Sequence, residues 1–181
     1  MQNNKRYELN TNPDLWKTPN TSLNCGAFAL NVNKWVTPYC PIDDEDDEEE
    51  CGYIRTSVIE EMYEDGLSID EITDALLALD SEMLLAACPW IERINLEDAR
   101  PDDRVIAYRV FVDEDALEEG EVDDDFHFRV RINGFWFEKC GQDPIRFCGT
   151  FADEAPWYVT PYLIYDSEVI YFRFRREENA E

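Results

Sequence analysis

Two residues, Asn133 and Gly134, constrain the fold of this chain more than any others. Asn-Gly between two runs of alternating apolar residues is the strongest short signal for a tight β-hairpin, because a type I′ turn needs positive φ at both central positions. The sequence therefore predicts strands over 126–132 and 135–140. Counting outward from the turn gives the register, which pairs Ile132 with Phe135, Arg131 with Trp136, Arg129 with Glu138, and His127 with Cys140.

Alternation along the two strands divides their side chains between two faces. One face is apolar and must belong to the core: Phe126, Phe128, Val130, Ile132, Phe135 and Phe137. The other face is polar and mixed, as expected of a surface or a groove: His127, Arg129, Arg131, Trp136, Glu138 and Cys140.

The remaining sequence predicts helices first and strands afterwards. Ser22 or Asn24 could cap a helix over about 25–35, and the acidic run 43–50 predicts a solvated loop. A short helix is expected over 57–64, and the capping-box pattern at 68–71 opens a longer one that runs to about Cys88. The side chains expected to point inward from the first and the longer helix are Phe28, Val32, Trp35, Ile72, Leu76, Leu79 and Met83.

Further strands are predicted over 105–112, about 158–165 and about 168–175, with an acidic excursion over 113–125. This order indicates an α+β fold with a mostly antiparallel sheet. The length of 181 residues and the hydrophobic fraction of 44% fit a single domain, 1–181, with an acidic loop at 42–51 and a charged tail at 176–181.

The net charge of −26 comes from 42 acidic and 16 basic residues. Such a surface repels free nucleic acid and anionic membranes and attracts basic proteins. The polar amino terminus shows no export signal, and no hydrophobic stretch is long enough to cross a bilayer, so we expect a cytoplasmic protein. Its six cysteines should then be mostly reduced, with Cys40 and Cys51 able to bridge under oxidation.

His127 is the only histidine, so imidazole chemistry near neutral pH must use this residue. Cys25 is its natural partner, because a thiol at a helix start beside an imidazole is the minimum set for a cysteine hydrolase. Glu138 lies diagonally from His127 and could orient the ring, or it could only pair with Arg129 opposite. Asp125 is a weaker orienting candidate, as is Asp143. Cys25 could also be a buried structural cysteine.

Asn24-Cys25-Gly26-Ala27-Phe28-Ala29-Leu30 resembles the nucleophile helix of papain-like cysteine hydrolases, the group that contains NlpC-type and CHAP amidases. The chain is more similar still to small bacterial and phage proteins of uncharacterised activity, which pair N-C-x-A-x-A-L with a later D-Y-H-F/W-Y and then W-S-H-K-P-G. Here the later segments read D-F-H-F-R at 125–129 and W-F-E-K-C-G at 136–141. The segment 105–110 resembles the strand before that histidine, so the likeness covers the first helix start and about 100–145.

The resemblance implies a papain-like fold, an N-terminal nucleophile helix packed on an antiparallel sheet. It implies Cys25 as nucleophile, His127 as general base and Glu138 as the third member, where relatives often carry histidine. Phe137, which replaces a small serine, would narrow the cleft. The implied reaction is acyl transfer from a peptide or other amide through a thioester, with peptide, peptidoglycan and isopeptide bonds all open.

No cofactor is expected. Short C-x-x-C spacings and a Gly-rich phosphate loop are both missing from the sequence. The acidic run also lacks the glycine of a calcium-binding loop. The alternative function is a non-catalytic acidic protein that binds a basic protein surface, such as a phage-type inhibitor that imitates DNA and blocks a nucleic-acid-binding enzyme.

Overall fold

The computed structural model describes residues 23–32, 35–39, 48–141, 143–158 and 164–176, with the backbone alone over 48–53. Its centre is a six-stranded sheet in the order β1-β6-β2-β3-β4-β5, in which every paired neighbour is antiparallel. The strands are β1 (Ile91–Ile94), β2 (Val105–Val112), β3 (Asp124–Ile132), β4 (Phe135–Glu138), β5 (Arg146–Gly149) and β6 (Ile170–Phe174). The α+β class and the antiparallel sheet are confirmed.

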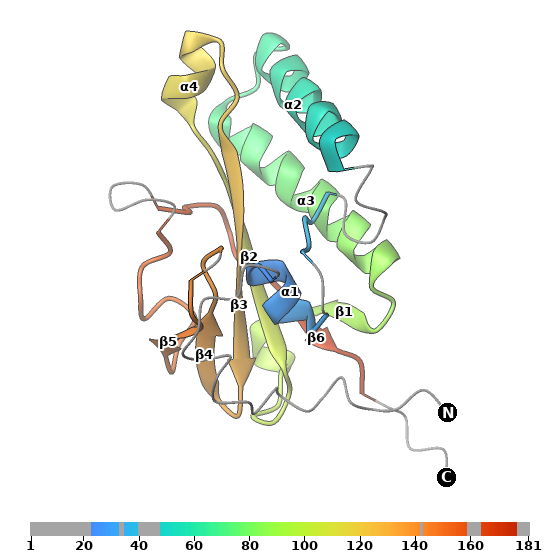
Figure 1. Cartoon of the computed structure of the whole chain (residues 1–181), viewed down its shortest axis with the longest axis vertical. Helices are drawn as coiled ribbons and strands as arrows, with labels where there is room; N and C mark the ends of the chain where they lie inside the picture. Colours follow the sequence, from blue (N-terminus) through green and yellow to red (C-terminus); the bar gives the residue numbers. More distant parts are fainter. Residues whose placement is uncertain (1–22, 33–34, 40–47, 142, 159–163, 177–181) are drawn as a thin grey trace.

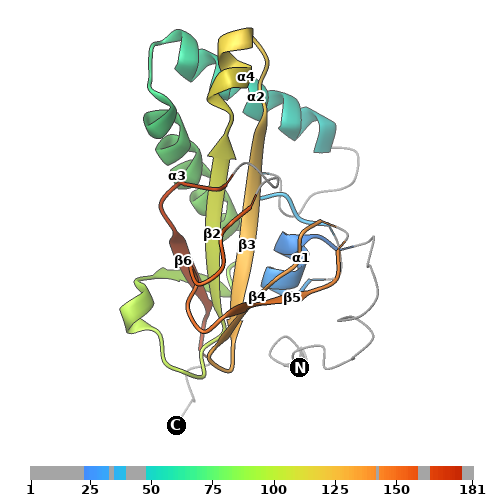
Figure 2. The same cartoon turned by 90° about the vertical axis from the view of Figure 1, so that its left-hand side faces the viewer.

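The helices lie at three places around the sheet (Figure 1). α3 (Ile69–Ala87) packs on β1 and β2, with α2 (Glu48–Glu64) alongside it. The short α1 (Cys25–Leu30) packs against β3 and β4, and Figure 2 shows it beside these strands, away from α3. α4 (Glu114–Glu119) joins the far ends of β2 and β3. None of the described helices is long and apolar enough to cross a membrane.

The hairpin forms as the sequence predicts. Asn133 has φ 52° and Gly134 φ 83°, the positive values that the turn requires. The observed register pairs Ile132 with Phe135 and Arg129 with Glu138. The strand after the turn is shorter than expected, because β4 ends at Glu138 and the predicted pairing of His127 with Cys140 does not form.

The main core lies between the helices and one face of the sheet. It joins α1 and α3 to the alternate residues Ile106, Tyr108 and Val110 of β2 and to Phe128 of β3. Three residues predicted to point inward are exposed: Leu79, Trp35 and, on the hairpin, Phe135 at 46%. Leu79 is 38% exposed and Asp80 is buried in its place, because Asp80 accepts bonds from Arg55 and Tyr108. Trp35 is 41% exposed and lies beyond the end of α1.

The opposite face of the sheet is largely a second core. Of the side chains expected there at a surface or a groove, His127 and Cys140 line a pocket, whereas Arg129, Trp136 and Glu138 are buried. Ala152, Trp157 and Tyr165, which follow β5 in the chain, pack against the strands on this face. The buried members of this second apolar cluster are Val105, Ala107, Phe111, Trp136, Cys148, Ala152, Trp157 and Tyr165. The charged residues Arg129 and Glu138 are buried on the same face, at 0% and 1% exposure, because they satisfy each other.

Both helix starts that the sequence predicted have their expected caps. The Asn24 side chain accepts from Ala27 N–H at α1, and Ser68 and Glu71 form a reciprocal capping box at α3. The first helix is shorter than 25–35, since Asn31 adopts the left-handed conformation (φ 56°) directly after Leu30.

The acidic segments carry more helix than expected. Residues 48–50 belong to α2 and not to a loop, and α2 extends well before 57; negative charge is favourable at a helix N-terminus. The rest of that predicted loop, 43–47, lies outside the described residues. The excursion 113–125 contains α4, which Asp113 caps.

The strand predictions at the carboxyl end were right once and wrong once. The strand expected over 168–175 is present as β6 and has nearly the same bounds. The strand over 158–165 is reduced to one bridge between Tyr158 and Ile164, with 159–163 outside the described residues. β1 and β5 were missed. β5 forms one edge of the sheet, where Phe147 is 60% exposed, and its pairing with β4 has a register shift.

Candidate functional site

Cys25 is the first residue of α1, and the neighbouring Asn24 holds it in place. Asn24 Oδ1 accepts from the N–H of Ala27 at 3.0 Å and of Val36 at 3.1 Å, and its Nδ2 donates to the Val36 carbonyl at 2.6 Å. One amide side chain therefore caps the helix and fixes the returning chain. Gly26 leaves no room for a side chain, because a Cβ there would lie 3.0 Å from the Val36 oxygen.

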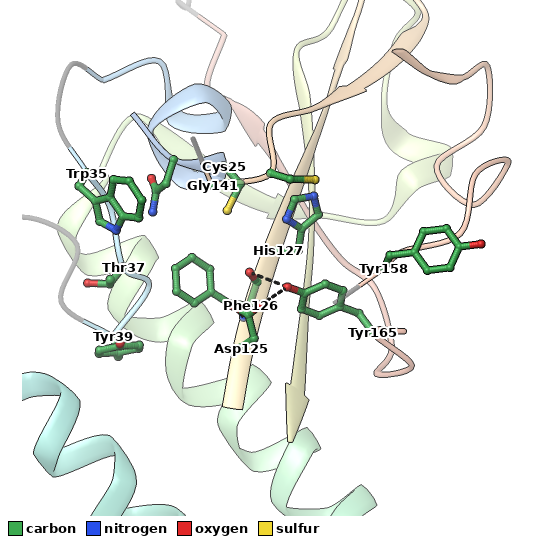
Figure 3. Close-up of a pocket in the computed structure, with 12 residues that line it drawn as sticks. Cys25, Trp35, Thr37, Tyr39, Asp125, Phe126, His127, Gly141, Tyr158 and Tyr165 are labelled. Carbon is green, nitrogen blue, oxygen red and sulfur yellow. Dashed lines mark hydrogen bonds between the residues drawn. The ribbon is translucent and has the colours of Figure 1, made fainter. Parts of the chain in front are cut away.

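His127 lies on β3 just beyond the point where β4 ends. The pairing of β3 with β4 stops at Arg129 and Glu138, so that edge of β3 carries no β4 partner at His127. Cys25 lies here. Both residues line a pocket of about 400 Å³, and Figure 3 shows the Cys25 sulfur and the His127 ring facing each other.

The His127 ring forms a hydrogen bond with Glu138, and the nearby Cys140 and Cys25 thiols also favour its protonated form. The distance from Nε2 to Glu138 Oε2 is 3.0 Å. Burial opposes protonation, but these three side chains outweigh it and raise the pKa of His127 well above 6.5. The raised pKa favours the protonated, cationic form of the ring.

Two aromatic rings hold the imidazole in its orientation. Tyr165 stacks on it with ring centroids 5.5 Å apart and an interplanar angle of 25°, and Trp157 meets it edge-on at 5.9 Å. Neither role was predicted from the sequence.

Glu138 both contacts the His127 ring, as an orienting carboxylate would, and pairs with Arg129, the two roles that the sequence left open. Oε2 accepts from His127 Nε2 and also from Arg129 Nε at 2.7 Å, while Oε1 accepts from Arg146 Nε. Burial alone would raise the pKa of this carboxyl, but the hydrogen bond and charge of His127 and the charge of Arg129 hold it well below its usual range. It is an anion that can orient and stabilise an imidazolium.

Arg129 is a positioning residue that the sequence did not reveal. Its guanidinium donates to the carbonyls of Ala152, Ala155 and Pro156 at 2.5–2.7 Å and lies 4.2 Å from the centre of the Trp157 ring. It thereby ties the segment that covers the imidazole to the carboxylate that orients it.

The two weaker orienting candidates do other things. Asp125 lines the pocket, and its Oδ2 accepts from Tyr165 Oη at 2.5 Å. Asp143 lies in a turn, where its N–H donates to the Cys140 carbonyl.

The other described cysteines differ from Cys25 in their surroundings. Cys25, Cys88, Cys140 and Cys148 are all free thiols. Burial and the Glu138 charge raise the pKa of Cys148 to about 12, so this thiol is inert at neutral pH. Cys140 also lines the pocket. The possible Cys40–Cys51 bridge lies outside the described residues.

His127, Glu138 and Cys140 bring ligand atoms within 4.8 Å of one another, which is close enough for a metal ion. The surroundings argue against that use. Arg129 and Arg146 both bind the Glu138 carboxylate, so two guanidinium groups already neutralise the oxygens that a cation would need.

Cys25 combines two properties that the sequence set against each other. The residue is only 5% exposed and belongs to the apolar core, as a structural cysteine would. It also lines the pocket together with the imidazole, as a nucleophile would. Access to this sulfur is therefore through the pocket.

No family model, no curated protein and no solved structure matches this chain. The papain-like resemblance thus stays a prediction that depends on the motifs and on the geometry of this site.

Proposed function

We propose that this protein is a cysteine-dependent peptidase or amidase with a papain-like arrangement. The observation that supports the proposal most is the position of the His127 imidazolium, between the Cys25 sulfur and the Glu138 carboxylate at the wall of a pocket. The Glu138 carboxylate matches the orienting acid of a cysteine hydrolase, and the candidate nucleophile Cys25 lines the same pocket as the ring.

In the first half of the reaction the Cys25 thiolate attacks the carbonyl carbon of a bound amide. A C–S bond forms, and the charge that develops passes to the carbonyl oxygen. When the tetrahedral intermediate collapses, the C–N bond breaks and the His127 imidazolium donates its proton to the departing amine. The products are a thioester on Cys25 and a neutral ring.

In the second half the neutral His127 takes a proton from water, and the resulting hydroxide attacks the thioester carbon. The C–S bond breaks, the carboxylic acid leaves, and the thiolate and imidazolium are restored. Glu138 does not move a proton. It stabilises the imidazolium and keeps the ring nitrogen aimed at the sulfur.

The papain-like part of the proposal is supported by order and placement. A short helix that begins with the candidate nucleophile packs against β3 and β4. His127 and then Glu138 follow on two neighbouring antiparallel strands. The glutamate in place of the histidine that relatives often carry is explained by Arg129 and Arg146, which require an anion there.

The test is selective thiol labelling with iodoacetamide at about pH 6.5, where ordinary thiols react slowly. Mass spectrometry of tryptic peptides gives the rate at each cysteine. We expect Cys25 to react fastest and to lose that advantage in His127→Gln. Cys148→Ser is the matched control and should leave the Cys25 rate unchanged.

Turnover is tested with a mixture of fluorogenic peptides. Cys25→Ser and His127→Ala should each abolish hydrolysis while the circular dichroism spectrum stays unchanged. Equal, slow labelling of all cysteines would contradict the proposal and support the acidic binding protein. Hydrolysis that survives in either variant would remove that residue from the mechanism.

A further inference from the structure

The pocket that contains Cys25 and His127 has aromatic walls. Its aromatic lining residues are Trp35, Tyr39, Phe126, Tyr158 and Tyr165. In Figure 3 Trp35 and Tyr39 lie on the side of the pocket near Cys25, and Tyr165 and Tyr158 lie on the opposite side. Trp35 and Tyr158 remain 41% and 46% exposed, so their rings are available to an incoming molecule.

A carboxylate lies between the two walls. Asp125 accepts from Tyr165 Oη and from the Phe126 N–H at 2.7 Å, and these neutral donors hold it in place without cancelling its charge. Burial and the Asp125 charge raise the pKa of Tyr165, so the phenol stays a neutral donor. None of the ion pairs in the described part of the chain includes Asp125.

The positive groups near the pocket already have partners. Lys139 donates from Nζ to the Gly141 carbonyl and interacts with the Asp143 charge. Arg55 stacks on Tyr39 at 4.7 Å but pairs with Asp80 and Asp124. His127 pairs with Glu138. No lysine or arginine belongs to the described pocket lining.

The charges beyond the pocket increase its preference for cations. Asp123 and Asp124 precede Asp125 directly, and the charges of Asp113, Asp124 and Asp125, together with burial, raise the pKa of Asp123. The whole chain carries a formal charge of −26. Both the local and the global field concentrate cations at this opening.

We propose that this pocket is a substrate subsite for a cationic side chain, lysine or arginine, next to the amide bond that Cys25 attacks. The inference deepens the proposed hydrolase and depends on it for the position of the scissile bond. Aromatic faces attract an ammonium or guanidinium group through their quadrupole, and Asp125 supplies the opposite charge. The alkyl part of the lysine or arginine side chain packs on those aromatic rings of the pocket that do not contact its charged group.

The experiment measures binding and not turnover. Cys25→Ala is titrated with N-acetyl-lysine methylamide, followed by two-dimensional amide NMR. The matched probe is N-acetyl-norleucine methylamide, which has the same carbon chain without the amine. N-acetyl-glutamate methylamide tests the opposite charge. We expect the lysine probe to bind about tenfold more tightly than norleucine and the glutamate probe to bind most weakly.

Variants locate the effect within the pocket. In the Cys25→Ala background, Asp125→Asn should remove most of the lysine preference, whereas Asp123→Asn, an exposed neighbour outside the lining, should change it less than about twofold. Trp35→Leu should weaken lysine binding more than norleucine binding. Tyr165→Phe removes the hydrogen bond to Asp125 but keeps the charge, and it should retain the preference.

Equal binding of lysine and norleucine, or no lysine binding at about 10 mM, overturns the subsite. Equal losses in the Asp125 and Asp123 variants overturn it as well, since a diffuse field would then explain the preference. The outcomes distinguish a failure of the subsite proposal from a failure of the hydrolase proposal. Lysine binding in Cys25→Ala, with no turnover by the unmodified protein, keeps the subsite and removes the reaction. Turnover by the unmodified protein without a preference for lysine keeps the hydrolase and removes the subsite.

Discussion

Replacement of Glu138 by glutamine tests whether the buried charge at the centre of the site is needed for stability. The carboxylate is 1% exposed and serves His127 and Arg129 through one oxygen and Arg146 through the other. Glutamine has nearly the same shape but no charge, so Glu138→Gln leaves the guanidinium of Arg129, at 0% exposure, without its counterion. Removal of one partner from a buried ion pair costs about 3–5 kcal/mol of unfolding free energy.

The corresponding fall in melting temperature follows from chain length. For a chain of this size each kcal/mol lowers Tm by about 2–4 °C, so we expect a fall of about 6–20 °C. The assay is urea unfolding followed by tryptophan fluorescence, with Tm from calorimetry. Glu92→Gln is the control, because Glu92 forms the same kind of pair with Arg173 (2.6 Å) but its side chain is 35% exposed. Such a pair contributes about 0–1 kcal/mol.

The pH dependence adds a second check on the same variant. Because the folded-state pKa of Glu138 is depressed, its contribution to stability is present above the ordinary carboxyl pKa of about 4.3 and is lost as the pH falls through the folded value. The difference between the unmodified protein and Glu138→Gln should therefore be largest near neutral pH and should narrow below about pH 4. A loss no larger than that of Glu92→Gln, or one independent of pH, would refute the reasoning.

Three further outcomes follow from the site. His127 gives the only histidine Cε1–H signal in an NMR pH titration, and its pKa should lie well above the usual 6.5. Cys140→Ser should lower the pKa of His127, because the interaction with Cys140 is a main cause of the raised value. The stability contribution of this ring is present below about pH 6.5 and is lost as the pH rises through the folded pKa, so unfolding free energy should decline on the alkaline side. Gly26→Ala should cost about 1–3 kcal/mol, measured by urea unfolding, because its Cβ would press on Val36. Asn24→Ala should lower the unfolding free energy by about 1–2 kcal/mol, because the helix cap is lost, and should slow the alkylation of Cys25. An unchanged alkylation rate would show that Asn24 does not position the sulfur.

The hairpin could be predicted from sequence because its signal is local. The turn needs residues that tolerate positive φ, and the register then follows by counting. The same counting placed Glu138 within reach of both His127 and Arg129, and the structure contains both contacts.

The burial of charged residues could not be predicted in this way, because it depends on partners far along the chain. Asp80 is buried since Arg55 and Tyr108 reach it from other elements. Arg129 is buried since a segment more than twenty residues later supplies three carbonyls. Neither long-range partner leaves a periodic signal, so the polar face of the hairpin was interpreted as a surface or a groove.

Within the described residues β5 is an edge strand, and this edge has a consequence for how copies of the chain behave together. Edge strands offer unpaired backbone groups to a second molecule, and Phe147 adds an exposed ring at this one. The formal charge of −26 opposes such an encounter over a range of about 10 Å at 0.1 M salt but only about 3 Å at 1 M. Mutual repulsion therefore provides the colloidal stability that the strand itself does not, and concentrated salt weakens that protection without altering the fold of a single molecule.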